Sequence, residues 1–261
     1  GTVDVCEKMG IDVECHVSLV EESLEKANIG LFNGMSSLVH PRALFRLLQG
    51  MRFGSILNIS ASLANPARPR FGVRGVYSPK IISTVVHTMK ELGFCRALVL
   101  HGQSPDPSGG MDEVSPLGTT WISELHDDGA IESYTIEASD FGRAAIKPEA
   151  IAACSDPEQE AVRMMELFIG KERGSRFFTV CLNTAPILYL AGQADTLRQG
   201  FEMAAEILCS GQALSTIEDW IFWQNRDPQS GLRSFNRLLS LLDSRYTPCV
   251  SNTGPNTYWN A

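Results

Sequence analysis

The stretch from residue 71 to residue 102 constrains the fold more than any other part of the sequence. An apolar segment, FGVRGVYSP at 71–79, precedes KIISTVVHTMKELG at 80–93, where apolar residues recur at helical spacing and a glycine closes the helix. FCRALVLHG at 94–102 is a continuous apolar run of strand length. Strand, helix and strand joined by tight turns are typical of a parallel sheet covered by helices. We therefore predict an α/β fold with a mostly parallel sheet flanked by helices.

Segments on either side extend this pattern. Residues 29–34 are short and apolar, and they predict a strand that follows a helix. Two β-prone runs at 119–142, joined by DDG, predict a hairpin. From apolar residues at helical spacing, helices are expected at 18–28, 40–51, 156–170, 176–192, 196–225 and 231–246.

Composition and cysteine usage exclude several classes of protein. No apolar run approaches the roughly 20 residues that a membrane-spanning helix requires, and GTVDVCEKMG at the start lacks the features of a secretory signal. The seven cysteines are odd in number, scattered and without CxxC spacing, so neither a disulfide framework nor a structural zinc site is indicated. We therefore expect a cytoplasmic protein without a membrane partner.

The charge balance argues against a polynucleotide partner. With 22 lysines and arginines against 30 aspartates and glutamates, the formal net charge is −8 at pH 7, and such a chain repels a phosphate backbone. The basic group of note is Arg68, Arg70 and Arg74 in NPARPRFGVRG. This group fits a solvated loop or a small anionic ligand site better than a nucleic-acid surface.

The loop HGQSPDPSGGMDEVSP, at 101–116, places Asp112 and Glu113 side by side just past the end of an expected strand. Ligands of open α/β sheets bind beyond the carboxyl ends of the strands. Mg²⁺ takes one or two protein carboxylates and leaves its other positions to water and substrate phosphate. The pair therefore suits Mg²⁺, although acidic pairs are also common on solvated turns. His101 has two interpretations as well, a ligand contact or a satisfied polar residue at the edge of the core.

Several motifs, in one order along the chain, resemble one family. GTVDVCEKMG resembles GSADVLEALG, VHPRALF resembles YHPAMK, and SILNISASLANPARPRFGVRGVY resembles TIFNLLGPLTNPA…GVY. ALVLHG…GMDEVSPLGTT resembles AVVHGxxGLDExSxxGPT, and ELHDDGAIESYTIEASDFG resembles ELKDGxIxxYxIxPEDFG. On these motifs, which are collinear from residue 1 to about 216, the chain resembles the anthranilate phosphoribosyltransferases. Residues 217–261 run past the resemblance, and their role is open.

The resemblance implies a nucleoside-phosphorylase-like fold with a remnant of a small helical domain. The α/β phosphoribosyltransferase-like catalytic domain would comprise residues 1–34 and 53–246, the helical remnant 35–52 and an irregular tail 247–261. It implies a glycosyltransferase of tryptophan biosynthesis that transfers phosphoribose from phosphoribosyl diphosphate to anthranilate or a related small aromatic acceptor, with Mg²⁺ as cofactor. Because family members pair through the domain that contains 35–52, a homodimer is compatible with the resemblance.

By the same resemblance, Asp112 and Glu113 are the metal ligands, while the catalytic residues stay unknown. Ala61 stands where the family has a glycine that lets backbone approach the acceptor. Arg52 does not align with the family's acceptor arginine and is only a substitute for it, which leaves the acceptor open. The substrate-binding residues implied are His40, Pro41, Ala61, Asn65 and Arg52.

The family's Gly-rich diphosphate-binding loop and its other phosphate-binding segments precede the motif that GTVDVCEKMG resembles. We therefore expect the 261-residue chain alone to be inactive, with a missing amino-terminal segment or a separate chain completing the phosphoribosyl site. The alternative function is that of a non-catalytic relative that binds a ligand or nucleic acid. The intact acid pair and the negative net charge favour the enzyme.

Overall fold

The computed structural model describes residues 2–34, 36, 38, 59, 60, 63, 65–106 and 109–243 of the 261. Contacts divide the chain into two compact units. The first unit takes the described residues of Gly1–Asn65, Ala153–Glu172 and Ile207–Asn252, and the second those of Pro66–Ala152 and Arg173–Glu206. Among the described residues, no helix has both the length and the apolar character needed to cross a membrane.

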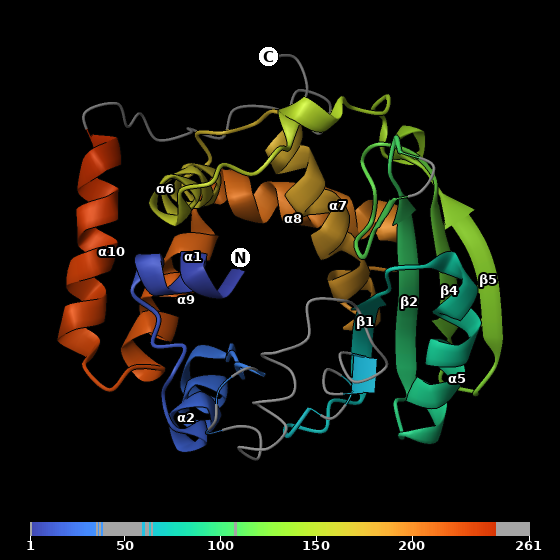
Figure 1. The fold of residues 1–261 in the computed structure, drawn as a ribbon, viewed down its shortest axis with the longest axis horizontal. Coiled ribbons are helices and arrows are strands. Elements are labelled where there is room, and N and C mark those ends of the chain that lie inside the picture. Colours follow the sequence, from blue (N-terminus) through green and yellow to red (C-terminus); the bar gives the residue numbers. More distant parts are fainter. Residues whose placement is uncertain are drawn as a thin grey trace. The chain divides into compact units, whose positions relative to one another are not determined.

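A mixed β-sheet forms the centre of the second unit (Figure 1). In spatial order its strands are β1, β2, β4 and β5, and the short β3 pairs with the end of β2. β1 and β2 run parallel, with Phe71 opposite Arg96 and Gly75 opposite Leu100, whereas β4 and β5 join antiparallel. The strands are β1 Phe71–Gly75, β2 Arg96–Gln103, β3 Gly110–Met111, β4 Thr120–Leu125 and β5 Ile131–Ile136.

The α/β class is confirmed, as are the expected hairpin at 119–142 and the strands around the helix at 80–93. The expectation of a mostly parallel sheet is wrong for the described strands, where one neighbouring pair is parallel and three are antiparallel. A parallel return requires a crossover, usually a helix. A helix lies between β1 and β2, but the described residues between β2 and β4 contain none, and a tight turn joins β4 to β5.

Helices cover both faces of this sheet. Tyr189 of α7 (Ser175–Leu190) hydrogen-bonds Glu124 of β4 at 2.8 Å, whereas Met89 of α5 approaches Gly72 of β1. Gly72 and Glu124 align with consecutive residues of β2, and consecutive strand residues point to opposite faces. The two helices therefore lie on opposite faces. α5 (Ile82–Glu91) buries side chains at helical spacing, namely Ile82, Val85, Val86 and Met89.

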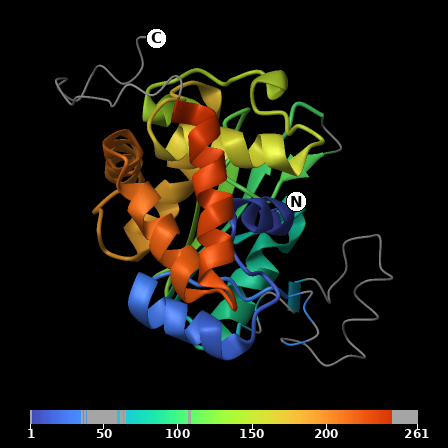
Figure 2. The same cartoon turned by 90° about the vertical axis from the view of Figure 1, so that its left-hand side faces the viewer.

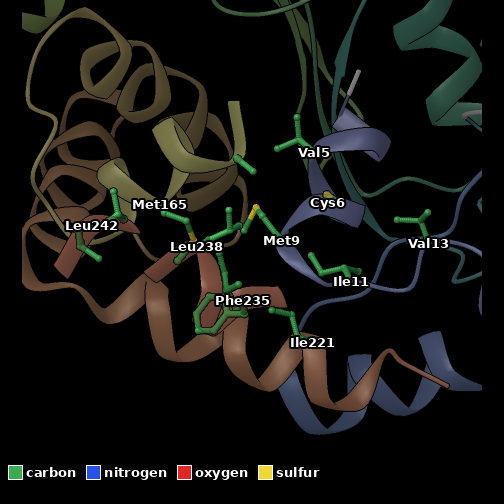
Figure 3. Packing of buried hydrophobic residues seen from close by; sticks show 13 residues of the cluster. Val5, Cys6, Met9, Ile11, Val13, Met165, Ile221, Phe235, Leu238 and Leu242 are labelled. Atoms are coloured by element: carbon green, nitrogen blue, oxygen red, sulfur yellow. The ribbon is translucent and has the colours of Figure 1, made fainter. Parts of the chain in front are cut away.

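The first unit is helical in its described part. Its core joins Met9 of α1, Met165 of α6, Ile221 of α9, and Phe235 and Leu238 of α10, all buried (Figure 3). Figure 2 shows α10 alongside α1 and α6, which it contacts. The helix α8 (Leu197–Ser210) begins in the second unit and ends in the first. The helices of the first unit are α1 Thr2–Met9, α2 Val17–Ala27, α6 Pro157–Phe168, α9 Gln212–Trp223 and α10 Pro228–Asp243.

Three local features differ from the sequence-based expectations. α1 was not among the expected helices, although it buries Val5, Cys6 and Met9 at helical spacing. Residues 29–34 form no strand, since the side-chain amide of Gln224 takes the place of a partner strand: it accepts from the Leu31 N–H at 2.7 Å and donates to the Leu31 carbonyl at 3.1 Å. The long helix expected at 196–225 is broken at Gly211, whose φ of 75° is left-handed.

Two expected segments fall largely or wholly outside the described residues. They are the helix at 40–51, within the expected remnant at 35–52, and the tail at 247–261. The expected division into a catalytic domain, a helical remnant and a tail therefore stays a prediction. The same holds for a homodimer paired through residues 35–52.

Candidate functional site

The acid pair lies on a loop that rests directly on the ends of two strands. β1 and β2 are parallel, so their carboxyl ends meet at one edge of the sheet, the upper edge in Figure 1. A Cβ added at Gly75, the last residue of β1, would overlap the carbonyl oxygen of Asp112. A Cβ at Gly102 of β2 would overlap the carbonyl of Glu113 in the same way. Because glycine has no Cβ, these two positions let the loop backbone pack directly against the sheet.

Polar contacts hold the loop just after the acid pair. Asn183 of α7 accepts from the Val114 N–H at 2.8 Å, and its amide donates to the Val114 carbonyl at 3.1 Å and to the Thr179 carbonyl at 3.0 Å. Ser115 donates its hydroxyl to the Gln103 carbonyl at 2.5 Å, and the Thr120 hydroxyl accepts from the Ser115 N–H at 2.9 Å. The backbone on the carboxyl side of Glu113 is thus fixed to both the sheet and α7.

Asp112 and Glu113 themselves are exposed. Even so, surrounding protein atoms raise the pKa of Glu113, and the negative charge of Asp112 raises it further. Two carboxylates that repel each other at the end of a sheet form an oxygen donor set that a hard divalent cation would neutralise. In the described part of the chain, no group of three or more His, Cys, Asp and Glu side chains could hold a metal. A site built on the pair fits Mg²⁺ with substrate and water as its other ligands.

Arg74 of β1 lies near Asp112. Burial lowers the pKa of its guanidinium, and the Asp112 carboxylate acts in the opposite direction. Its Nε atom is buried and has no hydrogen-bond partner. The site therefore combines two acids with one cationic side chain.

His101 has a structural role. It is 4% exposed, and its Nδ1 donates to the carbonyl of Val76 at 2.7 Å. Its ring stacks on Trp121 with centroids 6.1 Å apart, and it packs so closely on Gly110 that a Cβ there would overlap it. The interpretation as a satisfied polar residue at the edge of the core is the one that these contacts support.

Of the five residues expected to bind substrate, the structure describes one. His40, Pro41, Arg52 and Ala61 lie outside the described residues. Asn65 is described and exposed, but it belongs to the first unit and the acid pair to the second. The substrate-binding role of all five residues stays a prediction.

Sequence reasoning did not connect two further residues, Asn183 and Arg74, with the acid pair. The signal for Asn183 is weak, an amide side chain within a largely apolar helix. Arg74 was grouped with Arg68 and Arg70 as a solvated basic loop or a small anionic ligand site, yet Arg70 donates from Nε and Nη2 to the Cys95 sulfur at 3.2 and 3.1 Å. Which arginine of the three stands beside the acid pair depends on strand pairing, so spacing alone could not identify it.

Several known proteins are similar to this chain. The family model described as "Glycosyl transferase family, a/b domain" matches residues 1–214. Anthranilate phosphoribosyltransferase from Tolumonas auensis is 32% identical over 217 residues, which are 83% of this chain and 62% of that protein. The resemblance read from the sequence motifs is confirmed.

Solved structures agree with this fold. Anthranilate phosphoribosyltransferase from Thermus thermophilus superimposes with a TM-score of 0.71 at 28% identity, covering 86% of this chain and 64% of that one. The Saccharomyces cerevisiae enzyme in complex with PRPP and Mg has a TM-score of 0.65 at 21% identity, with 89% and 61% covered, and shows the same fold. The chain thus spans somewhat less than two thirds of the length of these proteins.

Proposed function

Because the chain belongs to the glycosyl transferase family, a/b domain, we propose that it serves the transfer of phosphoribose from phosphoribosyl diphosphate to anthranilate or a related small aromatic acceptor. Relatives at about 30% identity carry the name of that activity. The proposal places the protein in tryptophan biosynthesis and in the cytoplasm. The acceptor stays the least defined part, because most of the residues that would contact it lie outside the described ranges.

The observation that carries the proposal is the acid pair on its fixed loop. Asp112 and Glu113 expose two carboxylates where the parallel strands end; the Asp112 carbonyl packs on Gly75, and Asn183 holds the backbone just after Glu113. These two acids would hold Mg²⁺. When bound, the ion would stabilise the negative charge that develops on the departing diphosphate. The chain's own part in catalysis is to keep both carboxylates in one orientation, so that the donor binds in a defined position.

The test compares Asp112→Asn with Glu113→Gln in the complete gene product, assayed with phosphoribosyl diphosphate, Mg²⁺ and anthranilate. Each substitution preserves side-chain shape but removes a charged ligand, so we expect turnover to fall by about 10²-fold or more. Binding of Mg²⁺ with pyrophosphate, followed by calorimetry, should weaken in parallel.

The sheet offers a matched control. Asp127 and Asp128 are a second exposed acid pair, on the turn between β4 and β5. Asp127→Asn and Asp128→Asn remove the same net charge and should leave turnover and binding unchanged. Equal effects of the two pairs would show that only net charge matters, and would overturn the proposed metal site.

Two expectations can be tested with the same assays. The 261-residue chain is assayed alone beside the complete gene product, since we expect it to be inactive by itself. Binding of pyrophosphate with Mg²⁺ by the complete gene product, without turnover on any aromatic acceptor, would favour the non-catalytic alternative.

A further inference from the structure

We infer that Arg74 is an anion-binding residue of the site, and that its guanidinium contacts an oxygen of the same diphosphate that the metal on Asp112 and Glu113 would bind. This inference rests on the proposed function and adds a protein group to it. The sequence groups Arg74 with Arg68 and Arg70 and does not distinguish it from them, so the argument comes from its surroundings.

The side chain of Arg74 is partly buried, and one of its donors has no hydrogen-bond partner. It extends from β1, one residue before Gly75, where the loop backbone presses on the strand. Its Nε is buried with no hydrogen-bond partner, and no other buried side-chain nitrogen or oxygen in the described part of the chain is left in that state. Buried donors are almost always paired, because an unpaired one has lost its hydrogen bonds to water without replacement.

Neighbouring arginines show what a purely structural guanidinium does in this sheet. Arg70 is bonded to the sulfur of Cys95 through two nitrogens. Arg96 donates to the Leu190 carbonyl at 3.4 Å, stacks on the ring of Tyr189 at 4.9 Å and pairs with Glu124 at 3.9 Å. Arg74 instead keeps an unpaired Nε, and Asp112 lies close enough to act on its guanidinium by charge.

The chemistry of the missing partner follows from charge. Arg74 stays cationic because arginine is not deprotonated in proteins, and its planar fork of donors matches phosphate oxygens. Asp112 acts on it by charge, yet the Nε proton stays unpaired. An oxyanion that bridges a metal on the acid pair and the guanidinium would satisfy both charges at once. A diphosphate is such a ligand, since it presents oxygens to two cations.

The alternative is that Arg74 only neutralises the acid pair. The two roles predict different changes in affinity when the charge of Arg74 is removed. As a countercharge, Arg74 would weaken binding of Mg²⁺ and would have no separate effect on the affinity for a metal-bound anion. As an anion contact, it would strengthen binding of Mg²⁺ together with the anion. Removing the charge should therefore leave Mg²⁺ binding alone unchanged or tighter, while it weakens binding of Mg²⁺ with pyrophosphate.

The experiment measures both affinities by calorimetry on the complete gene product, with Mg²⁺ alone and with Mg²⁺ plus inorganic pyrophosphate. Arg74→Met should weaken pyrophosphate binding by about tenfold or more, and should not weaken binding of Mg²⁺ alone. Arg74→Lys, which keeps the charge and loses the fork, should fall between Arg74→Met and the unsubstituted protein. Arg70→Met is the matched control and should bind pyrophosphate normally.

Each outcome decides the question. If Arg74→Met binds pyrophosphate as well as the unsubstituted protein while Glu113→Gln does not, Arg74 is not a ligand but the proposed metal site stands. If Arg74→Met and Arg74→Lys both weaken binding of Mg²⁺ alone as much as binding of Mg²⁺ with pyrophosphate, the residue acts only through the fold. The inference then fails. If the unsubstituted protein does not bind pyrophosphate with Mg²⁺, the proposed function and this inference fail together.

Discussion

Replacing Asn183 by alanine should release the acidic loop from α7. The change removes the two hydrogen bonds to Val114, at 2.8 and 3.1 Å, and one to the Thr179 carbonyl at 3.0 Å. The third matters least, because the Thr179 carbonyl already lies within the hydrogen-bonding pattern of the helix. The Val114 N–H and carbonyl would both lose their partner, and Val114 is only 2% exposed.

An unpaired buried backbone group costs about 1–3 kcal/mol. Two such groups, partly reached by water because the acid pair next to them is exposed, give about 2–4 kcal/mol for opening the loop. With a factor of ten for every 1.4 kcal/mol, the Val114 amide should exchange its hydrogen about 30 to 700 times faster. Native-state hydrogen exchange of Asn183→Ala measures this directly, and Mg²⁺–pyrophosphate binding in the same variant reports the effect on the acid pair.

Two further variants separate the loop contact from general damage to α7. Thr184→Val removes a hydroxyl that donates to the Val180 carbonyl at 2.8 Å within the same helix, and it should leave Val114 exchange unchanged. Asn183→Asp keeps an acceptor for the Val114 N–H but loses both donated bonds, so Val114 should exchange faster than in the unsubstituted protein. Unchanged Val114 protection in Asn183→Ala would refute the view that this side chain fixes the loop.

Two other predictions follow from the same contacts. Gly75→Ala should destabilise the protein by about 1–3 kcal/mol in denaturant unfolding, because its Cβ would overlap the Asp112 carbonyl; Gly109→Ala, whose Cβ meets only ordinary contacts, should stay within about 0.5 kcal/mol. Burial raises the pKa of Asp12, but hydrogen bonds from Arg226 outweigh this and hold the pKa below its usual range. A lowered folded-state pKa means stability that is present above the unfolded pKa and lost as the pH falls through the folded one. Asp12→Asn should therefore be less stable than the unsubstituted protein at pH 7, with a gap that closes below about pH 4, and a gap independent of pH would contradict the assignment.

Much of the local structure could be predicted from the sequence. α5 and its flanking strands follow from apolar residues at helical spacing and from apolar runs of strand length, and the hairpin follows from DDG. The acid pair was found for a similar reason, since adjacent residues on one loop stay together whatever the rest of the chain does. Motif order along the chain was also enough to identify the family.

Other features depend on residues far apart in the sequence, so no local pattern could reveal them. Leu31 pairs with Gln224 instead of a strand, and the two are separated by 193 positions. The direction of β4 depends on whether a helix intervenes before it, which strand-like composition does not report. A strand segment and a coil segment with similar composition differ only in the partner that the fold brings to their backbone groups.

The residues of the candidate site also differ in whether the sequence alone could identify them. Sequence alone determined that this chain carries Asp112 and Glu113 on a loop after an apolar strand, because that information lies within a few consecutive residues. Only the tertiary structure decided that Gly75 lies under the loop, that Asn183 holds it from α7 and that Arg74 stands beside it. Those three residues meet the acid pair through sheet pairing and helix packing, and such long-range contacts are chosen by the burial of whole elements and not by any short run of residues.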